Sequence, residues 1–317
     1  MSQSTRHLWR GIHLGLGHDA DIEALIGELP TLAEMGLNVL MPEINYQFAY
    51  TSHPELRGED PITPEAARRL SAVCRDLGVR LIPQFQCLGH QSWAEKTFPL
   101  LTQYPEFDER PGQFPKNEDI YCRSWCPQHP DVNPIIFELF DELLQAFEAD
   151  ALHVGLDEVF LIGSEHCPRC KGQDPAALFA KAVHDYHAYL VGERGVEMLM
   201  WGDRLLDGVA TGYGLWEASE NGTDPAIDRI PTDIIICDWH YELMEQYPSI
   251  AIFLEKGFRV LPGGWKDEDA TQALLDAALA YREDPRMLGY LCTTWGRTRP
   301  GELAMFPPIR LVMAALT

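Results

Sequence analysis

The sequence predicts a TIM barrel, the closed (β/α)8 member of the α/β class, built as a single domain of 317 residues. Eight short apolar runs of strand length occur along the chain, amphipathic stretches lie between most of them, and no obvious linker separates them. A chain of this length accommodates one large α/β barrel or two ordinary domains. The regular alternation of βα units favours the closed barrel over an open sheet.

The strand-like runs are predominantly apolar, as expected for buried parallel strands. In order they cover residues 8–14, 37–44, 79–85, 151–156, 197–201, 233–237, 258–261 and 287–294. Clear amphipathic helices cover residues 64–77, 133–147, 175–194 and 270–282. Gly36 and Gly78 follow predicted helices, where a left-handed cap is favoured, and Thr63 before Pro64 is typical of a helix start.

Two long segments, residues 88–130 and 205–231, interrupt the alternation of strand and helix. Their proline, glycine and aromatic content indicates ordered loops beside a site rather than disorder. Gly11, Gly15 and Gly17 lack the GxGxxG spacing of a dinucleotide-binding fold and precede no clear helix start.

The charge of the chain excludes several classes of partner. A formal net charge of −23 argues against binding to nucleic acid, whose phosphates need lysine and arginine, and against anionic membrane surfaces. No apolar run approaches the ~18 residues of a membrane span, and the first residues contain no apolar signal segment. We therefore expect a cytoplasmic protein with reduced cysteines and a small-molecule ligand.

The most distinctive stretch is residues 151–159, where an apolar run ends in two adjacent carboxylates, Asp157 and Glu158. A strand of a barrel core is otherwise nearly all apolar, so this ending indicates catalytic chemistry at the mouth of the barrel. Adjacent side chains of an extended chain point in different directions, and the two acids can therefore act on different parts of one substrate. The alternative is a helix N-terminus, where acids complement the helix dipole.

Polar and aromatic residues gather at the ends of the other predicted strands. They include Glu43, Asn45, Gln84, Gln86, His90, Asp203, Asp238 and His240, together with four tryptophans, Trp201, Trp239, Trp265 and Trp295. A single tryptophan is more often part of the core than of a binding site. Four of them at one barrel mouth favour a sugar pocket, because flat aromatic faces pack against the C–H face of a sugar ring.

The sequence resembles glycoside hydrolase family 20, the β-N-acetylhexosaminidases. The family strand His-x-Gly-Gly-Asp-Glu is matched by residues 153–158, with Leu156 in place of the second glycine. Further segments are similar and lie in the family order: Trp9-Arg10-Gly11, residues 82–90 ending in Gly-His, Trp201-Gly202-Asp203, and residues 292–296 containing Trp295.

The resemblance implies a retaining mechanism in which the 2-acetamido oxygen of the substrate attacks C1 and no enzyme nucleophile is needed. It implies that Glu158 is the acid and then the base, and that Asp157 orients the acetamido N–H. It also implies that Arg10 grips sugar hydroxyls. His153 is expected to support the site, or to be a satisfied core histidine, and His90 with the tryptophans and Asp203 is expected to contact substrate.

The chain departs from the family pattern around this motif. Gln84 and Gln86 stand where family members usually carry acids, and residues 264–267 stand where they place a tyrosine for the acetamido oxygen. Tyr241 is a candidate substitute. Arg297 stands where the family tends to offer a glutamate. We therefore expect a divergent single-domain member, with residues 1–317 forming the catalytic barrel and no separate N-terminal domain.

Two cysteine pairs suggest a metal site outside the chemistry. Cys167 and Cys170 form a CPxC turn directly after the catalytic strand, and Cys122 and Cys126 lie in the preceding long loop. Two such pairs complete the tetrahedral coordination of a structural zinc ion. Redox chemistry and unremarkable free thiols are the alternatives.

Together these features predict exo-hydrolysis of terminal β-linked N-acetylglucosamine or N-acetylgalactosamine from small glycans, without a catalytic cofactor. The alternative is a catalytically decayed sugar-binding protein on the same barrel, motivated by Gln84 and Gln86. A zinc hydrolase that uses the cysteine loop is disfavoured, because four cysteines leave no open coordination position.

Overall fold

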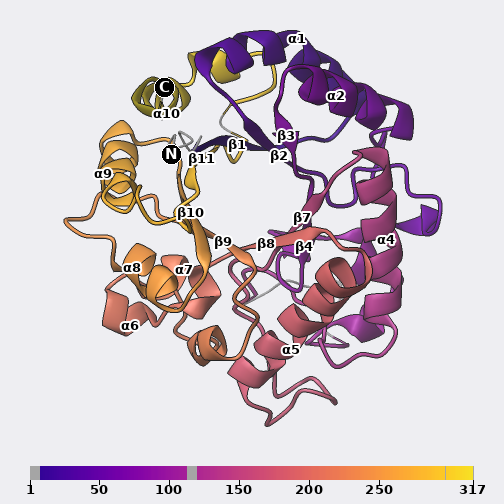
Figure 1. Cartoon of the computed structure of the whole chain (residues 1–317). Helices are drawn as coiled ribbons and strands as arrows, with labels where there is room; N and C mark the ends of the chain where they lie inside the picture. The colour runs from indigo at the N-terminus through magenta and orange to yellow at the C-terminus, as the bar shows by residue number, and fades with distance from the viewer. Residues whose placement is uncertain (1–7, 113–119, 297, 317) are drawn as a thin grey trace.

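Parallel strands form a closed barrel surrounded by a ring of helices (Figure 1). The computed structural model describes residues 8–112, 120–296 and 298–316. The barrel strands are β1 (Trp9–Gly15), β2 (Val39–Glu43), β3 (Arg80–Leu81), β4 (Gln84–Cys87), β7 (Ala151–Gly155), β8 (Glu197–Trp201), β9 (Ile235–Trp239), β10 (Arg259–Gly264) and β11 (Gly289–Thr293). Because β1 pairs with both β2 and β11, the sheet closes on itself.

All eight predicted strand positions are confirmed, and the third is divided into β3 and β4. Proline has no N–H to donate to the ladder, and Pro83 lies between the two short strands. The chain nevertheless stays in the wall of the barrel, because His153 N donates to the Pro83 carbonyl over 3.0 Å. We therefore count β3 and β4 as one barrel position, which makes the fold a (β/α)8 barrel.

The long helices cover the outer faces of the strands. They are α1 (Asp19–Met35), α2 (Pro64–Asp76), α4 (Val132–Ala146), α5 (Pro175–His187), α8 (Pro248–Glu255), α9 (Glu268–Leu279) and α10 (Pro307–Leu316). The predicted start of α2 is confirmed, since Thr63 Oγ1 accepts a hydrogen bond from Ala66 N over 3.2 Å. Gly36 ends α1 at a φ of +114°, in the left-handed conformation that glycine favours.

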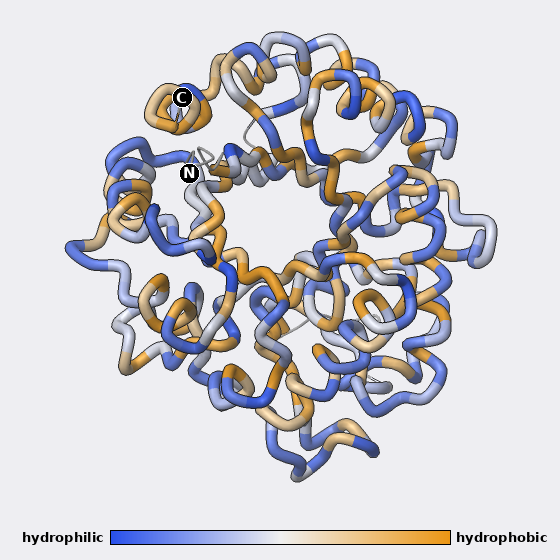
Figure 2. Tube along the Cα trace, in the orientation of Figure 1, coloured by the Kyte–Doolittle hydropathy of each residue, from blue (hydrophilic) through white to orange (hydrophobic). Residues whose placement is uncertain are grey.

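Hydrophobic residues occupy two regions of the core. One lies between the barrel and the helices, and Figure 2 shows it as the hydrophobic colouring of the strands and of many inward-facing helix segments. The other lies inside the barrel and contains Met41, Ile82, Leu199 and Leu291, among others. The C-terminal ends of the strands therefore stand on a packed floor, which positions the loops that follow them.

Both long predicted loops contain ordered structure in their described parts. Residues 88–112 and 120–130 include a β-hairpin of β5 (Ser92–Trp93) and β6 (Lys96–Thr97), followed by α3 (Pro99–Gln103). After β8, two single-turn helices, α6 (Gly208–Thr211) and α7 (Gly214–Glu217), stand in place of a long helix. Gly212 and Gly214 have φ values of +78° and +70°, which end one turn and begin the next.

No helix among the described residues is long and apolar enough to cross a membrane.

Candidate active site

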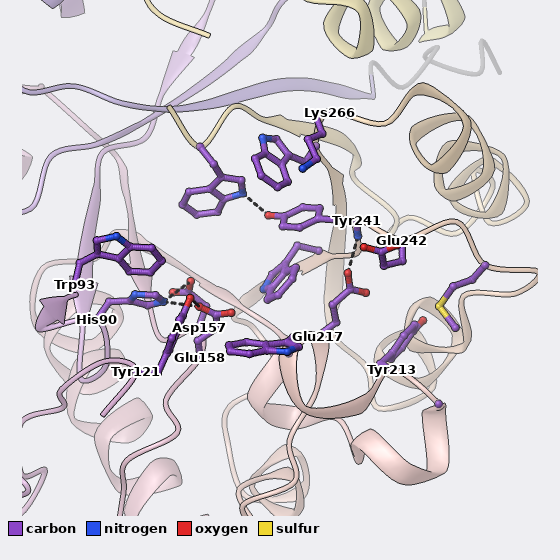
Figure 3. Close-up of a pocket in the computed structure, with 16 residues that line it drawn as sticks. His90, Trp93, Tyr121, Asp157, Glu158, Tyr213, Glu217, Tyr241, Glu242 and Lys266 are labelled. Atoms are coloured by element: carbon purple, nitrogen blue, oxygen red, sulfur yellow. Dashed lines mark hydrogen bonds and ion pairs between the residues drawn. The ribbon is translucent and has the colours of Figure 1, made fainter. Parts of the chain in front are cut away.

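A cavity of about 780 Å³ lies at the C-terminal ends of the barrel strands (Figure 3). Its wall is largely aromatic, with Trp93, Tyr121, Tyr213, Trp216, Trp239, Tyr241, Trp265 and Trp295. Its charged lining groups are His90, Asp157, Glu158, Glu217, Glu242 and Lys266. A pocket of this size with few polar groups among apolar faces is typical of a small-molecule site.

The backbone bends sharply where β7 meets the two carboxylates. Gly155, Leu156 and Glu158 have φ values of +67°, +75° and +48°. Glycine is required at position 155, because a Cβ there would lie 2.1 Å from Gln86 Oε1. Leu156, which stands in place of the second family glycine, adopts the left-handed conformation at a cost of about 1–2 kcal/mol. Its side chain is fully buried, so packing offsets this strain.

Asp157 is held as an anion between a histidine and an amide. Its Oδ1 accepts a hydrogen bond from Gln86 Nε2 over 2.6 Å, and its Oδ2 lies 3.3 Å from His90 Nε2. Burial would raise the pKa of Asp157, but His90 and the Gln86 donor outweigh burial, and the pKa is lowered. Asp157 is therefore ionised and fixed in direction at neutral pH.

Glu158 points into the same cavity from a different set of contacts (Figure 3). Tyr121 donates its hydroxyl proton to Glu158 Oε2 over 3.0 Å, and His90 Nε2 lies 3.1 Å from the same oxygen. The backbone N–H of Glu158 donates to Asp203 Oδ2 over 2.8 Å. One oxygen of each adjacent acid and one nitrogen of His90 lie within 4.8 Å of one another, so both acids can reach a single substrate.

His90 links the two acids to the long loop after β4. Its Nδ1 lies 3.2 Å from the sulfur of Cys122, and its Nε2 faces both carboxylates. Burial opposes the charged form of His90, but Asp157 and the other partners outweigh it and raise the pKa of His90 well above its usual value. A protonated His90 therefore balances part of the negative charge of the two acids.

The two glutamines that depart from the family pattern form a chain of side-chain contacts that leads to Asp157. His13 Nε2 lies 3.0 Å from Gln84 Oε1, Gln84 Nε2 donates to Gln86 Oε1 over 3.4 Å, and Gln86 continues to Asp157. Burial lowers the pKa of His13 to about 4, so this histidine is neutral at neutral pH. The chain of contacts presents an amide donor to Asp157 and adds no further charge.

Five of the residues predicted to bind substrate line the cavity. They are His90, Trp239, Tyr241, Trp265 and Trp295. Tyr241 Oη accepts hydrogen bonds from Trp295 Nε1 and, over 3.4 Å, from Thr293 Oγ1. Thr293 Oγ1 has a nearer acceptor, the Gly264 carbonyl at 2.9 Å, so the Tyr241 hydroxyl proton can be donated either to Thr293 or to a ligand.

Four other residues assigned to the predicted site, among them the expected supporting residue His153, lie outside the cavity lining. Trp201 and His153 are fully buried beneath it, with ring centroids 4.6 Å apart, and His153 Nδ1 accepts from Gly155 N over 3.0 Å. Asp203 is buried and holds Glu158 N and Arg204 Nε. These three residues therefore support the site from below instead of contacting the ligand.

Arg10 is the fourth, and the expectation that it grips sugar hydroxyls is not met. Its Nε donates to the Gly36 carbonyl, and its Nη1 donates to the Leu316 carbonyl over 2.8 Å. Arg10 is the second residue of β1, and the cavity lies beyond the other end of the strands. The arginine therefore ties β1 to the C-terminal helix.

Several lining residues escaped the sequence analysis. Trp93 and Tyr121 come from the loop after β4. Trp216 and Glu217 come from α7 after β8, and Tyr213 directly precedes that helix. Both loops were recognised as ordered segments beside a site. Their aromatic content was the signal, but no periodicity showed which side chains turn inward.

The cysteines do not form the predicted set of four. The sulfurs of Cys126, Cys167 and Cys170 and a carboxylate oxygen of Glu109 lie within 4.8 Å of one another. Cys122 instead contacts His90. The prediction that Cys122 completes the cluster is wrong, because the chain turns between residues 122 and 126 and places the two sulfurs on different neighbours.

Comparison with known proteins agrees with the geometry of the barrel. The sequence model of "Glycosyl hydrolase family 20, catalytic domain" matches residues 11–260. A beta-hexosaminidase of Vibrio furnissii is 23% identical over 93% of this chain and 49% of its own length. The beta-hexosaminidase subunit beta of Mus musculus is 26% identical over 50% of this chain and 30% of its own length.

Solved structures show the same fold. A chitobiase of Flavobacterium johnsoniae matches 97% of this chain and 48% of its own with a TM-score of 0.70 and 19% identity. An exo beta-N-acetylglucosaminidase of Vibrio harveyi, solved with N-acetylglucosamine, matches 98% of this chain and 54% of its own with a TM-score of 0.71 and 16% identity. The chain spans about half the length of these relatives or less. The extent of the family match shows that the chain belongs to glycoside hydrolase family 20.

Proposed function

We propose that this protein removes terminal β-linked N-acetylhexosamine from small glycans by a retaining, substrate-assisted mechanism. The observation that carries the proposal is the pair Asp157 and Glu158, which share His90 at one aromatic cavity but have different further partners. In this mechanism the acetamido oxygen of the substrate attacks C1, so the protein needs an acid and an orienting anion rather than a nucleophile.

Asp157 orients and stabilises the attacking amide. Its lowered pKa keeps it ionised, and Gln86 and His90 fix the direction of its carboxylate. An ionised carboxylate accepts the acetamido N–H and stabilises the positive charge that develops as the oxazolinium ring closes. The Tyr241 hydroxyl, which lines the cavity, is the candidate partner of the acetamido oxygen.

Glu158 supplies the proton to the leaving oxygen and afterwards removes a proton from the attacking water. Tyr121 and the backbone bond to Asp203 hold it in place at the rim of the cavity. Trp239, Trp265 and Trp295 offer flat faces to the C–H face of the sugar ring. The intact acid pair favours this activity over a decayed sugar-binding protein.

The proposal extends to the organisation and the compartment of the protein. The barrel of residues 1–317 acts as one catalytic domain, and the chemistry uses no metal or cofactor. All eight cysteines are free thiols, and five of them lie outside the cluster of Cys126, Cys167 and Cys170. This supports a reducing compartment such as the cytoplasm, which fractionation of cells expressing the tagged protein would test.

The test compares two substrates with different leaving groups. Nitrophenolate leaves without a proton, whereas the sugar of N,N′-diacetylchitobiose needs one. Glu158→Gln should therefore lower kcat/KM on the disaccharide by about 10²–10⁴-fold and lower it less on nitrophenyl β-N-acetylglucosaminide. Glu245→Gln, on an exposed loop, is the matched control. Equal activity of Glu158→Gln and wild type, or tight binding of a thiazoline analogue without turnover of any hexosaminide, would overturn the proposal.

A further inference from the structure

A second cluster of reactive side chains lies beside the active site and takes no part in the proposed chemistry. It contains Glu109 and Cys126 from the loop after β4, and Cys167 and Cys170 from the loop after β7. All four side chains are almost completely buried. Three thiols and a carboxylate rarely share a buried position without a function, because burying such groups without partners is costly.

The spacing of the four groups fits a tetrahedral zinc ion. Zinc binds sulfur at about 2.3 Å and carboxylate oxygen at about 2.0–2.2 Å, which separates two sulfurs by about 3.8 Å and a sulfur from the oxygen by about 3.5 Å. The ligand atoms lie within 4.8 Å of one another, and the sulfurs of Cys126 and Cys170 are 3.2 Å apart. Only small shifts are needed to reach the tetrahedral distances.

The carboxylate of Glu109 is directed toward this position. Its Oε2 accepts a hydrogen bond from Ser164 N over 3.1 Å, whereas its Oε1 is buried and has no hydrogen-bond partner among the described residues. A buried carboxylate oxygen without a hydrogen-bond partner is costly. A bound cation would pair with that oxygen and offset the free-energy cost of burying it.

Two of the sulfurs come from one short turn in which a backbone N–H donates to a sulfur atom, as is common in zinc sites. Cys167 and Cys170 lie three residues apart in a Cys-Pro-Arg-Cys turn, and Cys170 N donates to Cys167 Sγ over 3.4 Å. Soft thiolates in tetrahedral arrangement select zinc among the abundant divalent ions.

We propose that Glu109, Cys126, Cys167 and Cys170 bind one structural Zn²⁺ ion. The ion joins the loop after β4 to the loop after β7. The first loop carries Tyr121, which donates to the acid Glu158. The second carries Phe160, whose ring packs 5.4 Å from the ring of Tyr121. Zinc therefore holds the two loops that shape one side of the cavity.

The competing occupant of this position is a disulfide between Cys126 and Cys170. A disulfide has an S–S length of about 2.05 Å, shorter than the 3.2 Å found here, so both thiols are reduced in this arrangement. A disulfide would also leave Glu109 Oε1 buried without a partner. Four donors aimed at one point favour the metal over the disulfide.

The experiment measures the metal directly and does not depend on hydrolytic activity. Wild-type protein purified without added zinc and without chelators should contain one zinc per chain by elemental analysis. Modification of its thiols by an organomercurial should release one zinc per chain to a chromogenic chelator. Replacement of zinc by Co²⁺ should give the visible absorption of a tetrahedral site with thiolate charge-transfer bands.

The variants separate the proposed ligand set from the one expected from sequence. Cys167→Ser should lose most of the zinc, Glu109→Gln should bind it more weakly, and Cys122→Ser should retain one zinc per chain. If Cys167→Ser fails to fold, the wild-type zinc content and Co²⁺ spectrum still decide the question. Wild type without zinc that binds no Co²⁺, or a Cys126–Cys170 disulfide found by mass spectrometry, would overturn the proposal.

Discussion

Replacement of Gln86 by methionine tests whether an amide donor controls the charge of Asp157. Gln86 is buried, and its Nε2 donates to Asp157 Oδ1 over 2.6 Å. Methionine has a similar length and volume but no N–H. Gln86→Met therefore removes this hydrogen bond, together with the long one that Gln86 Oε1 accepts from Gln84 over 3.4 Å, and leaves the contact of His90 with the other oxygen of Asp157 in place.

The size of the effect follows from the charge of the acceptor. A hydrogen bond to a charged group contributes about 1.5–3 kcal/mol. If Asp157 acts as an anion in the transition state, losing the bond should lower kcat/KM by about 10- to 150-fold, at ~1.4 kcal/mol for each factor of ten. The donor stabilises the ionised form, so its removal raises the pKa of Asp157, and the acid limb of the pH profile should move to higher pH.

The assay is the pH dependence of kcat/KM on nitrophenyl β-N-acetylglucosaminide for wild type and Gln86→Met. Gln272→Met, an exposed position on α9, is the matched control and should match wild type. Thermal unfolding of each variant separates a change at Asp157 from loss of the fold. If Gln86→Met retains both the wild-type rate and the wild-type acid limb, the amide does not control Asp157.

Three further predictions concern the acid Glu158, the anchoring of β1 by Arg10, and the pH dependence of stability. Tyr121→Phe should lower kcat/KM by about 2- to 12-fold, because a partly exposed hydrogen bond to Glu158 contributes about 0.5–1.5 kcal/mol. Arg10→Met should destabilise the fold by about 1–3 kcal/mol, measured by thermal unfolding, with unchanged kcat and KM. His13 titrates near 4 when folded and near 6.5 when unfolded, so the unfolded state binds more protons between these values. Its contribution of about 3 kcal/mol to the free energy of unfolding should be lost as pH falls from 6.5 to 4, seen in urea titrations.

Each of these predictions has an outcome that contradicts it. An unchanged kcat/KM in Tyr121→Phe would mean that the tyrosine does not hold Glu158 in position. A raised KM with unchanged stability in Arg10→Met would return the arginine to the sugar site. A His13→Gln variant should show a weaker dependence of stability on pH in the same window, and an identical dependence would assign the effect to other groups.

The strands and the catalytic pair could be predicted from sequence because each depends on local patterns. Buried parallel strands are apolar runs, and the Asp157-Glu158 ending stands out against such a run. Arg10 was misplaced because the resemblance of a segment does not show how far along the strand it lies. Arg10 lies five positions before Gly15 at the end of β1, about 16 Å at ~3.3 Å per residue.

The remaining parts of the site depend on how loops fold. Tyr121 and Trp216 line the cavity from segments without periodicity, so nothing local shows their direction. Glu109 stands in the cysteine cluster where the sequence predicted Cys122, because the path of the chain decides which side chains meet, and a buried glutamate in a loop gives no sequence signal. The glutamines of β4 looked like losses, yet Gln86 directly contacts Asp157.

The most direct test of the central claim is a series of nitrophenyl substrates with zero to three fluorine atoms on the 2-acetamido group. Each fluorine withdraws electron density from the amide oxygen and weakens it as a nucleophile. If that oxygen attacks C1 while Asp157 orients the amide, kcat/KM should fall steeply along the series. A rate that does not change with fluorination would show that the amide is not the nucleophile and would contradict the mechanism.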